Sequence, residues 1–278
     1  MYHHDVIWYC HNRPALFYAI DFKIDRLVKL LLPSDADVDT MPPHKTYGNW
    51  PQTALHVAAR CGALSIVKDL VRRGASVELK SGPAARSLTA LHFAAEGGHA
   101  EVIKFLLESG ASPHSRSDSQ STPFYRAARS GSLKALQVLY DAGSDINALT
   151  WDKFTPLFEA VAHGRSRTAN QLLDWGADPT VVNGMGESVL KILKKSRNLD
   201  AQKTGKPLVT EDDVLNDIQR IRASGVGFAY YLKDVKPQYV LAMNIEMDTR
   251  PGPEREKDYR WSRDVSFIIC GDLKTDSQ

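Results

Sequence analysis

The chain has 278 residues, of which 43% are hydrophobic and 24% are charged, with 35 lysines and arginines against 33 aspartates and glutamates. These apolar and charged fractions are those of a globular protein, so they exclude disorder as the first interpretation. The formal net charge of +2 excludes a general electrostatic attraction to nucleic acid or to anionic lipid, because only a local patch could supply one.

The cysteines and the lengths of the apolar runs indicate in which cellular compartment the protein is expected. Cys10, Cys61 and Cys270 are far apart and odd in number, which favours free thiols in a reducing compartment over a disulfide framework. The first residues contain no apolar run of signal-peptide length. No segment reaches the roughly 18 to 20 apolar residues that a membrane span needs. We therefore expect a cytoplasmic or nuclear protein that has no membrane partner.

Residues 1–12 are expected to form an N-terminal segment that precedes the repeats. His3, His4 and His11 cluster there, but no cysteine or carboxylate set stands at metal-ligand spacing beside them. Residues 14–41 then carry two short apolar stretches and end in the turn sequence DADVD. The apolar positions that we expect this unit to bury are Leu16, Leu27, Val28, Leu31 and Leu32. Asp35, Asp37 and Asp39 lack the glycine and the final glutamate of a calcium loop, so a turn is the preferred interpretation and no metal site is predicted.

Four segments of the chain then repeat one pattern. They read TALHVAARCG from Thr53, TALHFAAEGG from Thr89, TPFYRAARSG from Thr122 and TPLFEAVAHG from Thr155. Each segment ends in a glycine, and a second glycine follows in each unit at a matching offset, at Gly74, Gly110, Gly143 and Gly176. Two glycine registers at a spacing of 33 to 36 residues predict an internal repeat.

Each unit is predicted to be two antiparallel helices. The threonine can cap the first helix, and Pro123 and Pro156 stand at the first helical position, where a missing N–H is tolerated. The two glycine sets end the first and the second helix, because glycine accepts the positive φ of such ends. The second helices carry apolar positions that only a stacked neighbour could bury. These positions are Ile66, Val67, Leu70, Val71, Val102, Ile103, Leu106, Leu107, Ala135, Leu136, Leu139 and Tyr140.

These motifs resemble the ankyrin-repeat family, and the resemblance covers about residues 13–196. It implies an all-α repeat solenoid of antiparallel helix pairs with hairpin turns, made of about five repeats and a partial sixth that begins at Gly186. In the first unit Lys23 and Asp35 stand where the glycines belong. That departure suits a terminal repeat with one face toward water.

Residues 197–278 are predicted to form a small α+β cap or extension with no recognised family. Thr210 and the acids that follow it open a helix with an apolar stripe of Val214, Leu215, Ile218 and Ile221, which Gly225 ends. Residues 240–247 and 265–270 are β-prone and predict a short strand pair. Whether this extension only caps the stack or acts as a separate functional element stays open.

The family resemblance implies a concave face formed by the first helices and the turns, and this face binds partners. The positions that match it, or that lie at the turn tips, are Tyr47, Trp50, Arg60, Phe93, Glu96, Arg126, Arg129, Trp151, Lys153, Glu159 and His163. Tryptophan beside arginine is typical of binding hot spots, although ordinary solvated charges are the alternative. His56 and His92 are expected to brace the turns instead, and Tyr125 and Phe158 replace that histidine in the later units.

The sequence is compatible with two functions. The first is a non-enzymatic adaptor or scaffold that binds a protein through the concave face, without a cofactor. It predicts that alanine at Trp151, Arg126 and Arg129 abolishes capture of the partner at an unchanged thermal midpoint. The second is a small-molecule-binding protein or enzyme, acting in a biosynthetic pathway, with a pocket between the repeats and the extension and with His163, Glu159, Tyr125 and the arginines as its polar groups. No catalytic motif is present, so no catalytic residue is assigned.

Overall fold

The structure is a computed structural model that describes residues 9–10, 13–32, 36–41, 51–82, 86–204, 207–225 and 227–228. Tyr47, Trp50 and the two β-prone runs at 240–247 and 265–270 lie outside these described residues. At the N-terminal end β1 (Tyr9–Cys10) pairs antiparallel with β2 (Arg13–Pro14). Every other regular element of the described residues is a helix, which confirms the all-α repeat class.

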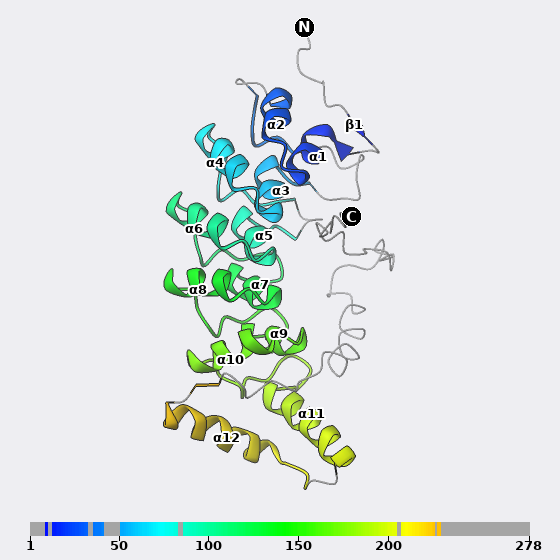
Figure 1. The fold of residues 1–278 in the computed structure, drawn as a ribbon, viewed down its shortest axis with the longest axis vertical. Helices are drawn as coiled ribbons and strands as arrows, with labels where there is room; N and C mark the ends of the chain where they lie inside the picture. Colours follow the sequence, from blue (N-terminus) through cyan, green and yellow to red (C-terminus); the bar gives the residue numbers. More distant parts are fainter. Residues whose placement is uncertain are drawn as a thin grey trace, which may run out of the picture.

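Helix pairs stack into two columns, as Figure 1 shows. The inner column consists of α1 (Ala15–Asp21), α3 (Ala54–Cys61), α5 (Ala90–Glu96), α7 (Pro123–Ser130) and α9 (Pro156–Ala162). The outer column consists of α2 (Asp25–Leu31), α4 (Leu64–Arg72), α6 (Ala100–Glu108), α8 (Leu133–Asp141) and α10 (Ser166–Asp174). A last pair, α11 (Val189–Thr204) and α12 (Glu211–Ser224), closes the foot of the stack. Among the described residues, no helix combines the length and the apolar character needed to cross a membrane.

The helix starts and ends lie where the threonines and glycines predict. Thr122 and Thr155 accept the backbone N–H of the residue three positions later, at 3.2 and 3.1 Å. Gly62 ends α3 with a φ of 67°, and a Cβ there would lie 2.5 Å from the ring of His99. Lys23, at the equivalent position of the first unit, adopts the same left-handed region with a φ of 55°. The terminal repeat therefore keeps the turn without the residue that favours it.

The hydrophobic core runs through all repeats. The side chains at the predicted apolar positions are buried or partly buried in it, with one clear exception. Ile66, Ile103 and Leu136 are buried between neighbouring repeats. Leu27 was expected to be buried, but its exposed fraction is 36%, and Leu30 beside it reaches 77%. The expectation was wrong for Leu27 because α2 is the outer helix of the first unit and packs on α4 on one side only.

Successive repeats are also joined by hydrogen bonds from the turns between inner and outer helices. The side chains that follow the glycine turns, those of His99, Ser132 and Arg165, reach a backbone carbonyl of the preceding repeat. Their partners are the carbonyls of Arg60, Gly98 and Arg129, at 2.9 to 3.1 Å. These bonds fix the offset between repeats, so side chains at equivalent positions share one surface.

The last helix pair forms the end of the stack. We expected the array to end at residue 196, but α11 continues through Thr204, because α12 packs along it with ion pairs between Lys194 and Glu211 and between Arg197 and Asp217. The predicted N-cap of α12 is present: Thr210 accepts the N–H of Asp213, whose carboxylate accepts the N–H of Thr210 in return. The described part of residues 197–278 is helical, and the predicted strands are outside it.

Candidate partner-binding surface

His56 and His92 hold the hairpins together, as expected. The backbone N–H of Thr53 donates to Nδ1 of His56, which leaves Nε2–H to donate to the carbonyl of Leu79 at 2.8 Å. His92 makes the equivalent bond to the carbonyl of Ser121. Burial lowers the pKa of His56 to about 4 and that of His92 to about 3. Both rings are therefore neutral structural groups at neutral pH.

The aromatic residues that replace these histidines have different contacts. Phe158 packs against Phe154 with a centroid distance of 4.8 Å. The phenol of Tyr125 donates to Oε2 of Glu159 at 2.7 Å, which connects α7 to α9. Burial raises the pKa of Tyr125 well above 10, and the neighbouring carboxylate of Glu159 adds to that shift. Tyr125 is thus held as a neutral donor.

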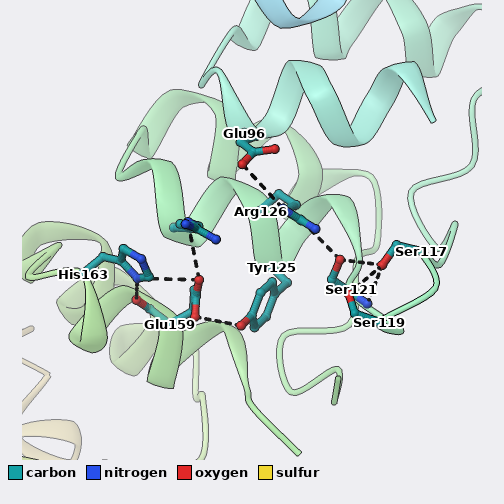
Figure 2. Close-up of polar contacts among 9 residues, drawn as sticks. Glu96, Ser117, Ser119, Ser121, Tyr125, Arg126, Glu159 and His163 are labelled. Carbon is teal, nitrogen blue, oxygen red and sulfur yellow. Dashed lines mark hydrogen bonds and ion pairs between the residues drawn. The ribbon is translucent and has the colours of Figure 1, made fainter. Parts of the chain in front are cut away.

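Glu159 is the centre of a polar cluster on the inner helices, shown in Figure 2. Its second oxygen, Oε1, lies 3.7 Å from Nε of Arg129 and 3.6 Å from Nδ1 of His163. The side chain of Glu159 is 9% exposed, whereas that of Arg129 is 40% exposed. Arg126, Arg129, Glu159 and His163 are the positions expected at the centre of the face. Arg129 and His163 lie beside Glu159, whereas the contacts of Arg126 are with Glu96 and Ser121.

Three predicted contact residues are buried rather than exposed. Arg126 is 3% exposed and Phe93 is 4% exposed, and Glu159 is also buried. Arg126 pairs with Glu96 at 3.5 Å and donates from Nε to Oγ of Ser121 at 3.2 Å, while Phe93 lies edge-on to the ring of His56. The expectation that these side chains are free to meet a partner was wrong, because the position after the L-H pair lies in the contact with the preceding repeat. These three buried side chains pack beneath the exposed residues of the surface.

The exposed predicted residues lie on the inner helices and at the hairpin tips. Arg60 lies 3.5 Å from Asp21, and Glu96 is the exposed member of its pair with Arg126. Lys153 is exposed at a tip with a φ of 59°. Trp151, on the same tip, has an exposed fraction of 69%.

Hydrogen bonds between neighbouring tips hold the segment that carries Trp151. Its backbone N–H donates to the carbonyl of Ser119 at 3.1 Å, and the carbonyl of Asp152 accepts the N–H of Gly184 at 2.8 Å. Three further apolar side chains on these tips are exposed and were missed at the sequence level, namely Leu149, Val182 and Met185. The spacing could have found two of them, because Leu149 and Val182 occupy the same position in consecutive repeats.

Two hollows of the structure are lined by other groups than those that the small-molecule alternative requires. A hollow of about 500 Å³ lies between α10 and α12, among Asp174, Trp175, Arg222 and Phe228. A second, of about 110 Å³, lies between α2 and α4. Neither is lined by Tyr125, Glu159 or His163. In the part of the chain that the structure describes, no group of three His, Cys, Asp or Glu side chains is placed to hold a metal ion.

Comparison with known protein families identifies the repeats. A family model described as ankyrin repeats (3 copies) matches residues 55–150 and again residues 91–183. These ranges extend from α3 through the hairpin before α11. The search of curated proteins found no match.

Proposed function

Because residues 55–183 are ankyrin repeats, a module that generally mediates protein–protein interaction, we propose that this protein is a scaffold or adaptor that holds a protein partner. The partner lies against the surface formed by the inner helices and the hairpin tips. Contacts in the centre come from Arg129 and His163, and contacts at the tips come from Trp151 and Lys153.

The observation that carries the proposal is the presentation of Trp151. Trp151, with an exposed fraction of 69%, leaves a large apolar area in water, which a partner could cover. Its backbone is tied to the neighbouring tip through Ser119, so binding would not have to order the segment that carries it. A rigid aromatic anchor of this kind is typical of residues that dominate the binding energy.

The polar cluster supports the same surface. Glu159 accepts from Tyr125 and holds Arg129 and His163 nearby. The partly exposed guanidinium of Arg129 is therefore positioned before a partner arrives, which lowers the entropy cost of a polar contact there. The groups beneath, Tyr125 and Glu159, stabilise the fold and position the exposed side chains, and they do not contact the partner themselves.

The alternative of a ligand-binding or catalytic pocket is less well supported by the geometry. Its proposed groups are engaged with one another on an open face, and the hollow between α10 and α12 is lined by other residues. No observation on this face selects a reaction.

The test is capture of a partner from the native cell with the full chain as bait, compared with Trp151→Ala. Leu30→Ala is the matched control, because Leu30 is an equally exposed apolar residue on α2, away from the tips. We expect partners that are retained by the parent and by Leu30→Ala and lost with Trp151→Ala, while the thermal midpoints stay the same. Equal recovery with all three baits would contradict the proposal.

A further inference from the structure

A chain of serine hydroxyls connects the buried Arg126 to the surface of a hairpin tip, as Figure 2 shows. Nε of Arg126 lies 3.2 Å from Oγ of Ser121, which lies 2.8 Å from Oγ of Ser117. Oγ of Ser117 lies 3.0 Å from Oγ of Ser119. Ser117 and Ser121 are 3% and 2% exposed, whereas Ser119 is exposed. This series of hydrogen bonds therefore begins at a buried cation and ends at a hydroxyl that is exposed to water.

The direction of this chain follows from counting hydrogens. Arginine can only donate, and each hydroxyl has one hydrogen. If Ser117 donated to Ser121, the buried hydrogen of Ser121 would lack an acceptor among the described contacts, at a cost that folded proteins avoid. The arrangement that satisfies every buried group runs from Arg126 to Ser121, from Ser121 to Ser117 and from Ser117 to Ser119.

This direction decides what the surface offers. The oxygen of Ser119 accepts from Ser117, so its own hydrogen is available to donate outward into solvent. Hydrogen-bond chains polarise their members, and a cation at the head strengthens each donor that follows. The exposed hydroxyl of Ser119 is thus a strengthened donor, and the partner that suits it is a hydrogen-bond acceptor, best of all an anionic one.

The neighbours of Ser119 define the rest of the partner. Its carbonyl accepts the backbone N–H of Trp151, so the hydroxyl and the exposed indole lie on adjacent tips. Lys153 adds an exposed cation, while Asp118 and Asp152 are exposed acids on the same tips. These two acids would repel a run of negative charge, so the site favours a single carboxylate beside apolar side chains.

We infer that the tips carrying Ser119 and Trp151 recognise a protein segment in which one aspartate or glutamate stands next to an apolar residue. The carboxylate accepts from the hydroxyl of Ser119 near Lys153, and the apolar side chain covers the indole of Trp151. This inference rests on the proposed function and specifies the partner of the same surface.

The experiment is selection of a phage-displayed library of random peptides on the full chain, followed by affinity measurement of the enriched peptides. We expect enrichment of one acid flanked by apolar residues. Ser119→Ala should weaken these peptides by about tenfold, the value of one hydrogen bond to a charged group. Ser119→Thr keeps the hydroxyl and should restore binding, and Ser109→Ala, which changes a serine at the end of α6, should have no effect.

The outcomes separate the inference from the proposed function. Peptides that lose binding with Trp151→Ala but bind Ser119→Ala as tightly as the parent would overturn the inference and leave the scaffold proposal intact. Enrichment of basic peptides, or equal binding of the matched amide peptides, would also overturn it. Failure of Trp151→Ala to weaken any selected peptide would contradict both.

Discussion

The phenol of Tyr125 on α7 donates a 2.7 Å hydrogen bond to the carboxylate of Glu159 on α9. In the two preceding full repeats the residue at this position is histidine, which bonds to the carbonyls of the hairpins. The change from histidine to tyrosine thus replaces a contact within the hairpin layer by one between inner helices. It also fixes the carboxylate that holds Arg129 and His163 on the proposed binding face.

Tyr125→Phe is expected to lower the free energy of unfolding by about 1.5 to 3 kcal/mol, because a buried carboxylate loses a hydrogen bond. Urea unfolding of both proteins measures this difference. Tyr140→Phe is the matched control, since Tyr140 acts through its ring, which stacks on Trp175 at 4.1 Å. Equal decreases in the free energy of unfolding of the two variants would contradict a stabilising role of the hydrogen bond to Glu159.

Arg126→Ala and Arg129→Ala should differ in stability. The side chain of Arg126 is 4% exposed and that of Arg129 is 40% exposed. Removing the buried Arg126 leaves Ser121 and Glu96 without their cation and should cost about 2 to 3 kcal/mol. Removing the half-exposed Arg129 should cost less than about 1 kcal/mol, because Glu159 keeps its hydrogen bond from Tyr125. The sequence-based expectation that both variants keep the thermal midpoint is therefore revised for Arg126. Differential scanning calorimetry compares the midpoints, and similar ones would contradict the burial argument.

Acid should destabilise the protein through His56 and His92. Their pKa values are lowered to about 4 and about 3 from the ordinary 6.5, so below pH 6.5 the unfolded chain binds more protons than the folded one. The stability present at neutral pH is consequently lost as the pH falls toward the folded-state values. The limiting slope is about 1.4 kcal/mol per pH unit for each histidine.

His92→Gln isolates one of these contributions. The variant should be less stable at neutral pH, because the bond to Ser121 is altered, but its free energy of unfolding should fall less steeply with acid. Urea unfolding between about pH 7 and about pH 5 measures both slopes. Parallel curves for the parent and the variant would refute the assignment.

Arg222 should attach α12 to the last regular repeat. Its guanidinium donates to the carbonyls of Ala177, at 2.6 Å, and Leu173, at 3.3 Å, at the end of α10. Arg222→Met should lower the opening free energy of the α12 amides, measured by hydrogen exchange, by about 1 to 2 kcal/mol. Arg220→Met is the control, because Arg220 makes an exposed pair with Asp217 within the same helix and should change little. Unchanged protection in both variants would contradict the role of Arg222.

The sequence by itself determined the repeat, its helix pairs and their ends. Threonine caps, prolines at the first helical position and glycines at positive φ act within a few residues, so their effect does not depend on the rest of the fold. For the same reason the brace role of His56 and His92 and the helix that begins after Thr210 were predictable.

Only the tertiary structure decided which side chains face water. The position after the L-H pair holds Phe93, Arg126 and Glu159, and all three are buried, because each inner helix is covered by its neighbours in the stack. The serine hydrogen bonds from Arg126 to Ser119 join residues no more than 5 positions apart, but their geometry is set by the hairpin that the stack holds in place. The adjacency of Ser119 and Trp151 depends on a contact between different repeats. Spacing along the chain places equivalent residues in one row, but burial and hydrogen-bond direction are set by how closely the repeats stack.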